Sequence, residues 1–184
     1  MQDQIQNIVD QALALPTFDR ADMFEAKERE IYDGTARLGD LIVQRHLQAV
    51  SDSESIRQAG RKWVQALPGR VKNQGLRYVR IQTFRGGTIT IRTAYFSRNC
   101  DAHKSRRGCY PVLVLLGIYG CRPHVTPALA NHIVLTVTSM GSLEEARAWL
   151  IQQGICWSVN GIRTLTYHYA ARVRYAQQQH GMRL

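Results

Sequence analysis

Residues 142–178, SLEEARAWLIQQGICWSVNGIRTLTYHYAARVRYAQQ, have the pattern of two helices joined by a tight connection. Ser142 followed by Glu145 is a capping box, in which the hydroxyl and the carboxylate each satisfy an unpaired amide of the first turn. Gly154 stands where a residue in the left-handed conformation ends a helix, so the first helix is expected to end near Gln153. Its apolar stripe consists of Leu143, Ala146, Trp149 and Leu150.

The second helix is predicted to begin after Ser158, a good N-cap residue, and to carry two chemically different sides. Its apolar side consists of Val159, Ile162, Leu165, Tyr169, Val173 and Ala176. The opposite side carries Asn160, Arg163, Thr164, Tyr167, His168, Arg172 and Arg174. A basic, polar helix side of this kind is expected to face water or a ligand.

Two short helices joined in this way fit a helix-turn-helix, whose second helix lies in the major groove of DNA. Asn160, Arg163, Thr164 and His168 come early enough in the helix to reach base edges. Asn and Arg each make paired hydrogen bonds to purines, and Thr contacts either a thymine methyl or a polar edge. Arg172 and Arg174 are expected near phosphates. The alternative is an ordinary helical hairpin with solvated charges.

The charge of the chain favours the DNA interpretation. The net charge is +10, but residues 1–54 hold five Lys and Arg against eleven acids, a balance of −6. Residues 55–184 hold nineteen basic residues against Asp101, Glu144 and Glu145, a balance of +16. This part is therefore expected to bind a polyanion, whether duplex DNA, RNA or a membrane surface.

Length, composition and cysteine content indicate the class of protein. A chain of 184 residues with 45% hydrophobic residues can bury a core as one domain or two small ones. No apolar run is long enough to cross a membrane, the N-terminus is no signal peptide, and a cytoplasmic, nucleoid-associated protein without membrane contact is expected. The spacing of Cys100, His103, Cys109 and Cys121 fits zinc poorly, so we expect neither a metal nor a cofactor.

The first 68 residues have the pattern of helices. An amphipathic helix is expected over residues 2–15, ended by Pro16, and a long one over residues 19–50 with Gly34 and Gly39 as weak points. A helix of that length would kink at the glycines, pair with a second copy as a homodimer, or pack onto a third helix over residues 53–67. These alternatives stay open.

A β-hairpin is predicted after a basic linker at residues 71–75. LRYVRIQTF (76–84) and TITIRTAYF (88–96) alternate in period two around Arg85-Gly86-Gly87. A three-residue loop would pair Ile81 with Ile91 and place Arg80 opposite Arg92 on the outer face, a like-charge pair that a bound polyanion would stabilise. Residues 98–108 are expected to form a basic loop. Its Lys104, Arg106 and Arg107, together with Tyr167 on the second helix, are expected to contact DNA.

The remaining chain is apolar. Residues 110–119 form a buried segment of either type, and residues 127–140 a buried helix with Pro127 in its first turn. The predicted fold is thus α+β and mostly helical: a helical region for which dimerisation is one of the alternatives (1–68), a hairpin with its basic loop (69–109), and a domain with a helix-turn-helix (110–184).

The order of these motifs resembles the N-terminal half of ISKra-type bacterial insertion-sequence transposases. The motifs are RGGTITIRTAYF, a basic loop, YPVLVLLGI, TPAL, SLEEA and VNGIRTLTYHYAAR, and MFEAKEREIYDGTARLGDLIV is similar to the leading helix of that family. The resemblance implies a region that recognises transposon-end DNA and precedes an RNase-H-like domain, whose acids hold two divalent ions for phosphoryl transfer.

The chain departs from that family because it ends at Leu184, and the three acids of residues 55–184 cannot supply a metal-holding triad. There is also no P-loop, GxGxxG or GxSxG motif. We therefore expect a mobile-element DNA-binding protein that is not an enzyme. The alternatives are the end-recognition subunit of a split transposase with a separate catalytic subunit, and an RNA-binding or protein-interaction module.

Overall fold

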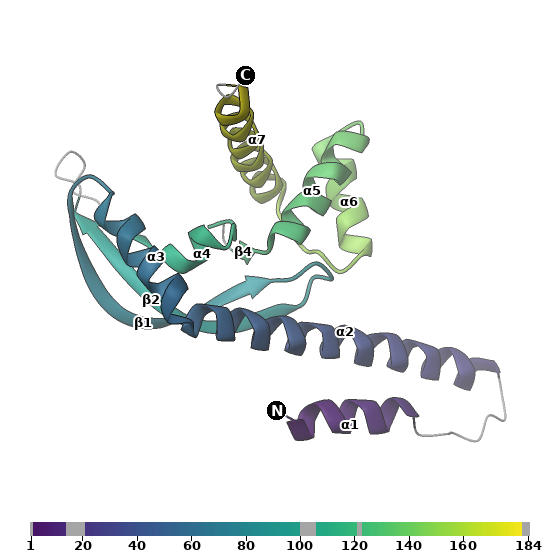
Figure 1. Ribbon diagram of the computed structural model, residues 1–184. Coiled ribbons are helices and arrows are strands. Elements are labelled where there is room, and N and C mark those ends of the chain that lie inside the picture. The colour runs from purple at the N-terminus through teal and green to yellow at the C-terminus, as the bar shows by residue number, and fades with distance from the viewer. Residues whose placement is uncertain (1, 14–20, 100–105, 121–122, 182–184) are drawn as a thin grey trace.

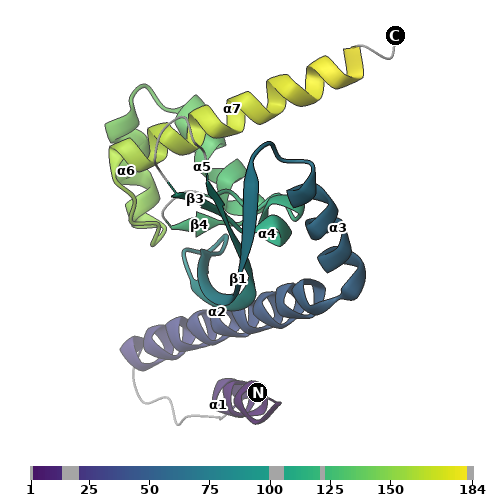
Figure 2. The ribbon, with the colours of Figure 1, turned by 90° about the vertical axis from the view of Figure 1, so that its left-hand side faces the viewer.

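A computed structural model describes residues 2–13, 21–99, 106–120 and 123–181. The described part has an α+β fold that is mostly helical, as predicted, with seven helices and four strands. Helices α1 and α2 lie on one side of a small mixed sheet, and α5 to α7 lie on the other (Figures 1 and 2). None of the described helices is both long and apolar enough to cross a membrane.

Two helices of very different length open the chain. Helix α1 (Gln2–Leu13) lies alongside α2 (Ala21–Asp52), which continues for 32 residues through both Gly34 and Gly39. A Cβ at Gly34 would stand 3.5 Å from Ile8 Cγ2, so this glycine lies at the contact with α1. Helix α3 (Glu54–Gln65) follows and packs against α4 (Pro111–Leu115), where Gly60 meets Pro111.

The hairpin consists of β1 (Arg70–Gln82) and β2 (Thr88–Asn99), and its register differs from the predicted one. Ile81 lies opposite Ile89, Arg80 opposite Thr90, and Arg92 opposite Tyr78, so the predicted Arg80–Arg92 pair is wrong. The loop does have three residues, but they are 84–86, because Gly86 takes the left-handed position at φ 79°. Arg80 and Arg92 are consequently diagonal neighbours on the exposed face.

The sheet is larger than the predicted hairpin. The segment predicted to be a linker, residues 71–75, belongs to β1, where the register shifts between Asn73 and Leu76. Strand β3 (Arg106–Cys109) pairs with β2, so the end of the predicted basic loop is a strand, and β4 (His124–Val125) pairs in parallel with β1. The resulting strand order is β3-β2-β1-β4.

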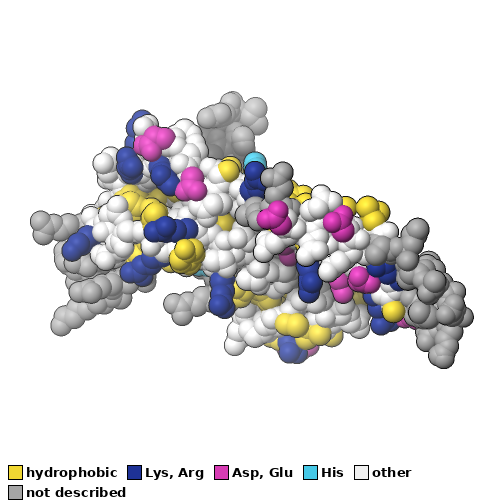
Figure 3. Space-filling view, turned by 90° about the horizontal axis from the view of Figure 1, so that it is seen from below, with side chains coloured by type: hydrophobic (Ala, Val, Ile, Leu, Met, Phe, Trp, Pro, Cys, Tyr) yellow, Lys and Arg dark blue, Asp and Glu magenta, His cyan; other side chains and the backbone are white. Residues whose placement is uncertain are grey.

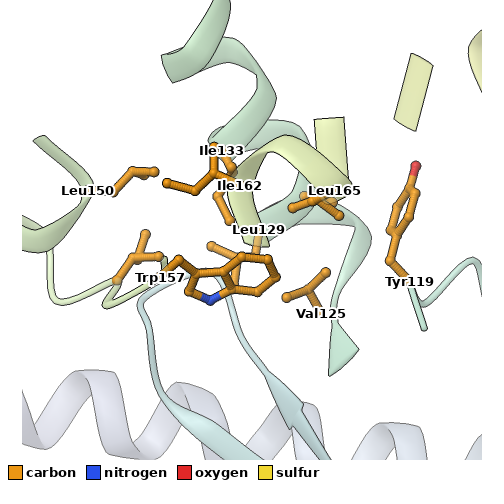
Figure 4. Close-up of a cluster of buried hydrophobic side chains, with 10 residues drawn as sticks. Tyr119, Val125, Leu129, Ile133, Leu150, Trp157, Ile162 and Leu165 are labelled. Atoms are coloured by element: carbon orange, nitrogen blue, oxygen red, sulfur yellow. The ribbon is translucent and has the colours of Figure 1, made fainter. Parts of the chain in front are cut away.

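The buried side chains form two clusters. The first lies on the inner face of the hairpin and consists of Val79, Ile81, Ile89, Ile91, Leu113 and Ile118. The second lies among α5 (Pro127–Ser139), α6 (Leu143–Gln152) and α7 (Val159–Gly181) and includes Tyr119, Val125, Ile155 and Trp157 from the segments beside them; its ten buried members are drawn in Figure 4. The predicted helix at residues 127–140 is confirmed, with Pro127 in its first turn and Thr126 as its N-cap.

Candidate nucleic-acid interface

Helices α6 and α7 begin at the N-cap residues that the sequence predicted, Ser142 and Ser158. Ser142 Oγ accepts a hydrogen bond from the Glu145 amide at 3.1 Å, and the Glu145 carboxylate accepts one from the Gly141 amide at 3.1 Å. Ser158 Oγ accepts from the Gly161 amide at 3.1 Å and so caps α7. The sequence therefore fixes where the second helix starts and which of its residues come first.

The connection at residues 153–158 is anchored in the protein interior. Gly154 has a φ of 79°, and the next two apolar side chains, Ile155 and Trp157, are buried. Figure 4 shows the Trp157 indole below the labelled residues of α5 and α7 and beside Val125. Its Nε1 donates to Gln82 Oε1 of β1 at 2.6 Å, and Arg147 Nε donates to the Trp157 carbonyl at 3.0 Å. The start of α7 is thus tied to both the sheet and α6.

Helix α7 separates a buried side from an outward side over its first three turns. Ile162 and Leu165 are fully buried, and Tyr169 is half-buried with its hydroxyl bonded to Asn131 Oδ1 at 2.9 Å. The predicted contact residues that lie on the outward side at three- and four-residue spacing are Asn160, Arg163, Thr164, Tyr167, His168 and Arg174, and all of them are exposed. We call these six residues the outward side of α7.

The side chains at the start of the outward side interact with one another. Arg163 Nη1 lies 3.4 Å from Asn160 Oδ1, and Thr164 Oγ1 donates to the Asn160 carbonyl at 2.8 Å. The Thr164 hydroxyl is therefore bonded to its own helix, which leaves its methyl group to contact a ligand. The Tyr167 ring is 68% exposed, so an apolar surface stands beside these polar groups.

Arg172, which was also predicted to contact DNA, turns toward the protein. Its Nη1 donates to the Gly117 carbonyl at 2.9 Å, and its Cζ lies 4.5 Å from the centre of the Tyr119 ring. This side chain fastens α7 to the segment before β4. Val173 and Ala176 were predicted to be buried but are exposed, because the second half of α7 extends past α5 and α6 (Figure 2).

The acidic and basic side chains are unevenly distributed in space as well as in sequence. The face on the side of α2 carries Asp and Glu side chains among its Lys and Arg side chains (Figure 3). All ion pairs between described residues involve cations in α2 or α3, namely Lys27, Arg29, Arg57 and Arg61. Within the described chain, Arg163 and Arg174 have no acidic partner and are available to an external anion.

The hairpin carries a second group of cations. Arg80 and Arg92 are exposed, and Arg92 Cζ lies 6.0 Å from the centre of the Tyr78 ring, which is itself 75% exposed. The backbone of Arg92 exchanges two hydrogen bonds with the Gln48 side chain of α2, at 2.8 and 3.1 Å. Through Gln48 the Arg92 backbone lies next to α2, which is on the opposite side of the sheet from α7 (Figure 1).

The predicted basic loop lies mostly outside the described residues, and so does Lys104. The backbones of Arg106 and Arg107 belong to β3, opposite Asn99 and Arg98. Of the residues weighed as zinc ligands, Cys100, His103 and Cys121 also fall outside the described chain, and Cys109 is half-buried at the end of β3. Among the residues that are described, no three His, Cys, Asp or Glu side chains are grouped closely enough to hold a metal ion.

A cluster of aromatic residues lies beside β3, and the sequence did not predict it. The Tyr95 and Tyr110 rings are 4.9 Å apart, Arg77 Cζ lies 4.1 Å from the centre of the Tyr95 ring, and His124 packs edge-on to Tyr110. Burial raises the pKa of the Tyr110 hydroxyl, Tyr95 raises it further, and Arg77 opposes the rise. Period-two alternation on β2 could have placed Tyr95, but not its partners from three other segments.

Comparison of the chain with protein-family models, with curated proteins and with solved structures gives no match in any of the three.

Proposed function

We propose that this chain binds double-stranded DNA, with α6 and α7 acting as a helix-turn-helix and α7 lying in the major groove. The observation that carries the proposal is the outward side of α7, where hydrogen-bonding, cationic and aromatic side chains are exposed together without acidic partners in the described chain. An unpaired cationic helix side is the electrostatic feature that attracts phosphates.

The order of residues along α7 supports a division of roles. Asn160 and Arg163 lie in the first two turns, where a recognition helix meets base edges, and their side chains suit paired hydrogen bonds to purines. Arg174 lies about 16 Å further along the helix axis, at a rise of about 1.5 Å per residue, and is assigned to phosphate. The connection at residues 153–158 is longer than the usual three- or four-residue turn, but Trp157 holds it in place.

The motif resemblance to insertion-sequence transposases supports transposon-end DNA as the target and the nucleoid as the place of action. Residues 55–184 contain only three acids, so the proposal assigns binding to this part of the chain and not phosphoryl transfer. A split transposase, in which a second polypeptide supplies the catalytic acids, uses the same DNA contacts.

Two substitutions test the division of roles on α7. Arg163→Ala is expected to reduce the preference for the correct base by about 1–3 kcal/mol at one or two base pairs of the site. The preference at the other base pairs should change little. Arg174→Ala is expected to weaken binding equally on all duplexes and to reduce the salt slope by about 0.9. Both effects are measured by fluorescence anisotropy on a duplex that the wild-type chain binds and on a set of its single-base-pair variants.

The matched control is Arg45→Ala, because Arg45 is an exposed arginine of α2, on the side of the molecule away from α7. It is expected to leave duplex binding unchanged. Equal losses for Arg163→Ala and Arg45→Ala would contradict a role for α7 in the groove.

The hairpin supports a second candidate function, the binding of single-stranded nucleic acid. Tyr78 is 75% exposed between Arg80 and Arg92, and an aromatic ring beside cations is a surface on which bases stack. Tyr78→Ala is expected to weaken binding to single-stranded RNA, but not to duplex DNA, if this surface is used. Titrations with both ligands at several salt concentrations separate the two functions.

A further inference from the structure

Helix α2 has one long side that nothing in the described chain covers. Its residues are Glu28, Ile31, Tyr32, Thr35, Gly39, Ile42, Val43 and His46, all exposed, and we call them the α2 stripe. Tyr32 is 63% exposed and Ile42 55%, although both are large apolar residues on an ordered helix. The stripe is about 27 Å long at a rise of about 1.5 Å per residue.

The other sides of α2 are occupied. Gly34 meets Ile8 of α1, Asp40 Oδ1 accepts a hydrogen bond from the Thr83 hydroxyl at 2.6 Å, and Gln48 bonds the backbone of β2. At about 100° per residue these positions point away from the stripe. The stripe therefore remains accessible with α1 and the hairpin in place.

We infer that the α2 stripe is a homodimer interface, in which α2 packs antiparallel against α2 of a second copy about a two-fold axis near residue 37. In that register Ile31 lies level with Val43 of the other copy and Tyr32 with Ile42, so large apolar side chains meet. Thr35 lies level with Gly39, so the two smallest side chains meet at the centre.

The two central residues, Thr35 and Gly39, both suit a close helix–helix contact. A Cβ at Gly39 would meet nothing within 4 Å, yet a glycine in a helix interior costs about 1 kcal/mol relative to alanine. A close approach of a second helix supplies the missing reason. The Thr35 hydroxyl already donates to the Tyr32 carbonyl at 2.9 Å, so the interface would bury it without leaving its donor unpaired.

Charge favours the antiparallel arrangement over the parallel one. Residues 21–33 hold five acids against two bases, whereas residues 34–46 hold two bases, Arg37 and Arg45, against Asp40. Antiparallel packing places the acidic half beside the basic half, and the Glu28 carboxylate level with the His46 ring, which can donate a hydrogen bond to it. Parallel packing would place five acids beside five.

The test is sedimentation velocity of the full chain without DNA, so that it is independent of the proposed function. An interface of eight residues per copy is smaller than the usual 20 to 30, and we expect a dissociation constant of roughly 1–100 µM. Ile42→Glu should make the protein monomeric, and Leu135→Glu, the same change at an exposed leucine of α5, should not. A wild-type monomer at about 300 µM, or a dimeric Ile42→Glu variant, would overturn the inference.

A charge exchange tests the register. Glu28→Lys and His46→Glu should each weaken dimerisation about tenfold, because each removes the carboxylate–imidazole contact, and the double variant should restore it through a Lys–Glu pair. In a parallel dimer the double variant would set Lys beside Lys and Glu beside Glu and would restore nothing. Failure of the double variant to recover would therefore rule out the antiparallel register, and circular dichroism confirms that each variant is folded.

Discussion

At the scale of single residues, Trp157 contributes most to the geometry of the candidate interface. Its indole is 5% exposed, lies in the core shared by α5 and α7, and donates to Gln82 Oε1 across 75 positions of sequence. Sequence periodicity placed Trp157 in a short connection between helices but could not identify its partner. A hydrogen bond between two distant segments leaves no local pattern.

Trp157→Phe is expected to keep most of the packing but to leave the buried Gln82 oxygen without a donor. That loss should lower the free energy of unfolding by about 1–3 kcal/mol, or the melting temperature by about 2–10 °C. Thermal denaturation followed by circular dichroism measures it. Trp149, which is 45% exposed on α6, is the matched control, and equal effects of Phe at both positions would show that the hydrogen bond contributes nothing.

Tyr110 makes the free energy of unfolding depend on pH in the alkaline range. Burial, assisted by Tyr95, raises its pKa above the ordinary value of 10.0, so the folded protein favours the neutral phenol. The corresponding stability is complete below pH 10 and is lost as the pH rises through the folded-state pKa. Tyr110→Phe should therefore lose less stability than the wild type as the pH rises above about 10 in urea titrations. Parallel curves for the two proteins would contradict this assignment.

At the scale of elements, the sequence predicted the helices better than the strands. The caps at Ser142 and Ser158 and the first-turn Pro127 are local signals, and all three stand where they were expected. The hairpin register was missed because registers that differ by two residues keep the same face apolar, so alternation cannot choose between them. Strands β3 and β4 have four and two residues, too few to show a period.

The buried side of α7 was predicted correctly only as far as Tyr169. Periodicity records which side of a helix is apolar, but not how far the neighbouring helices extend along it. Val173 is 41% exposed because it lies beyond the part of α7 that α5 and α6 cover. The outward side of α7 was predictable in composition, whereas the turn of Arg172 toward Gly117 and Tyr119 depends on residues more than fifty positions away.

Two glycine substitutions are expected to change the free energy of unfolding in opposite directions. Gly154 has a φ of 79°, so Gly154→Ala should cost about 1–2 kcal/mol and disturb the connection before α7. Gly34 is helical, and an added methyl would make an ordinary contact with Ile8, so Gly34→Ala should gain about 0.5–1 kcal/mol. Chemical denaturation measures the change in the free energy of unfolding of both variants. A stabilising Gly154→Ala would contradict the need for a left-handed residue at this position.

At the scale of the whole molecule, the charge imbalance of the sequence has a spatial counterpart. Most of the acids belong to α1, α2 and the start of α3, and α7 lies across the sheet from the first two of these helices (Figure 1). Composition predicted an acidic part and a basic part, but only the fold shows that α7 is separated in space from the acidic helices α1 and α2 (Figure 1). A polyanion can therefore be attracted to one end of the molecule without meeting the acidic helices.

The most direct test of DNA binding is the affinity of the wild-type chain for a labelled duplex, measured by anisotropy between about 50 and 300 mM salt. We predict clear binding at the lowest salt, a linear fall of log K with log salt, and a weaker slope when Arg163 and Arg174 are both replaced by Ala. No binding at about 50 mM salt, or a slope that the double substitution leaves unchanged, would contradict it.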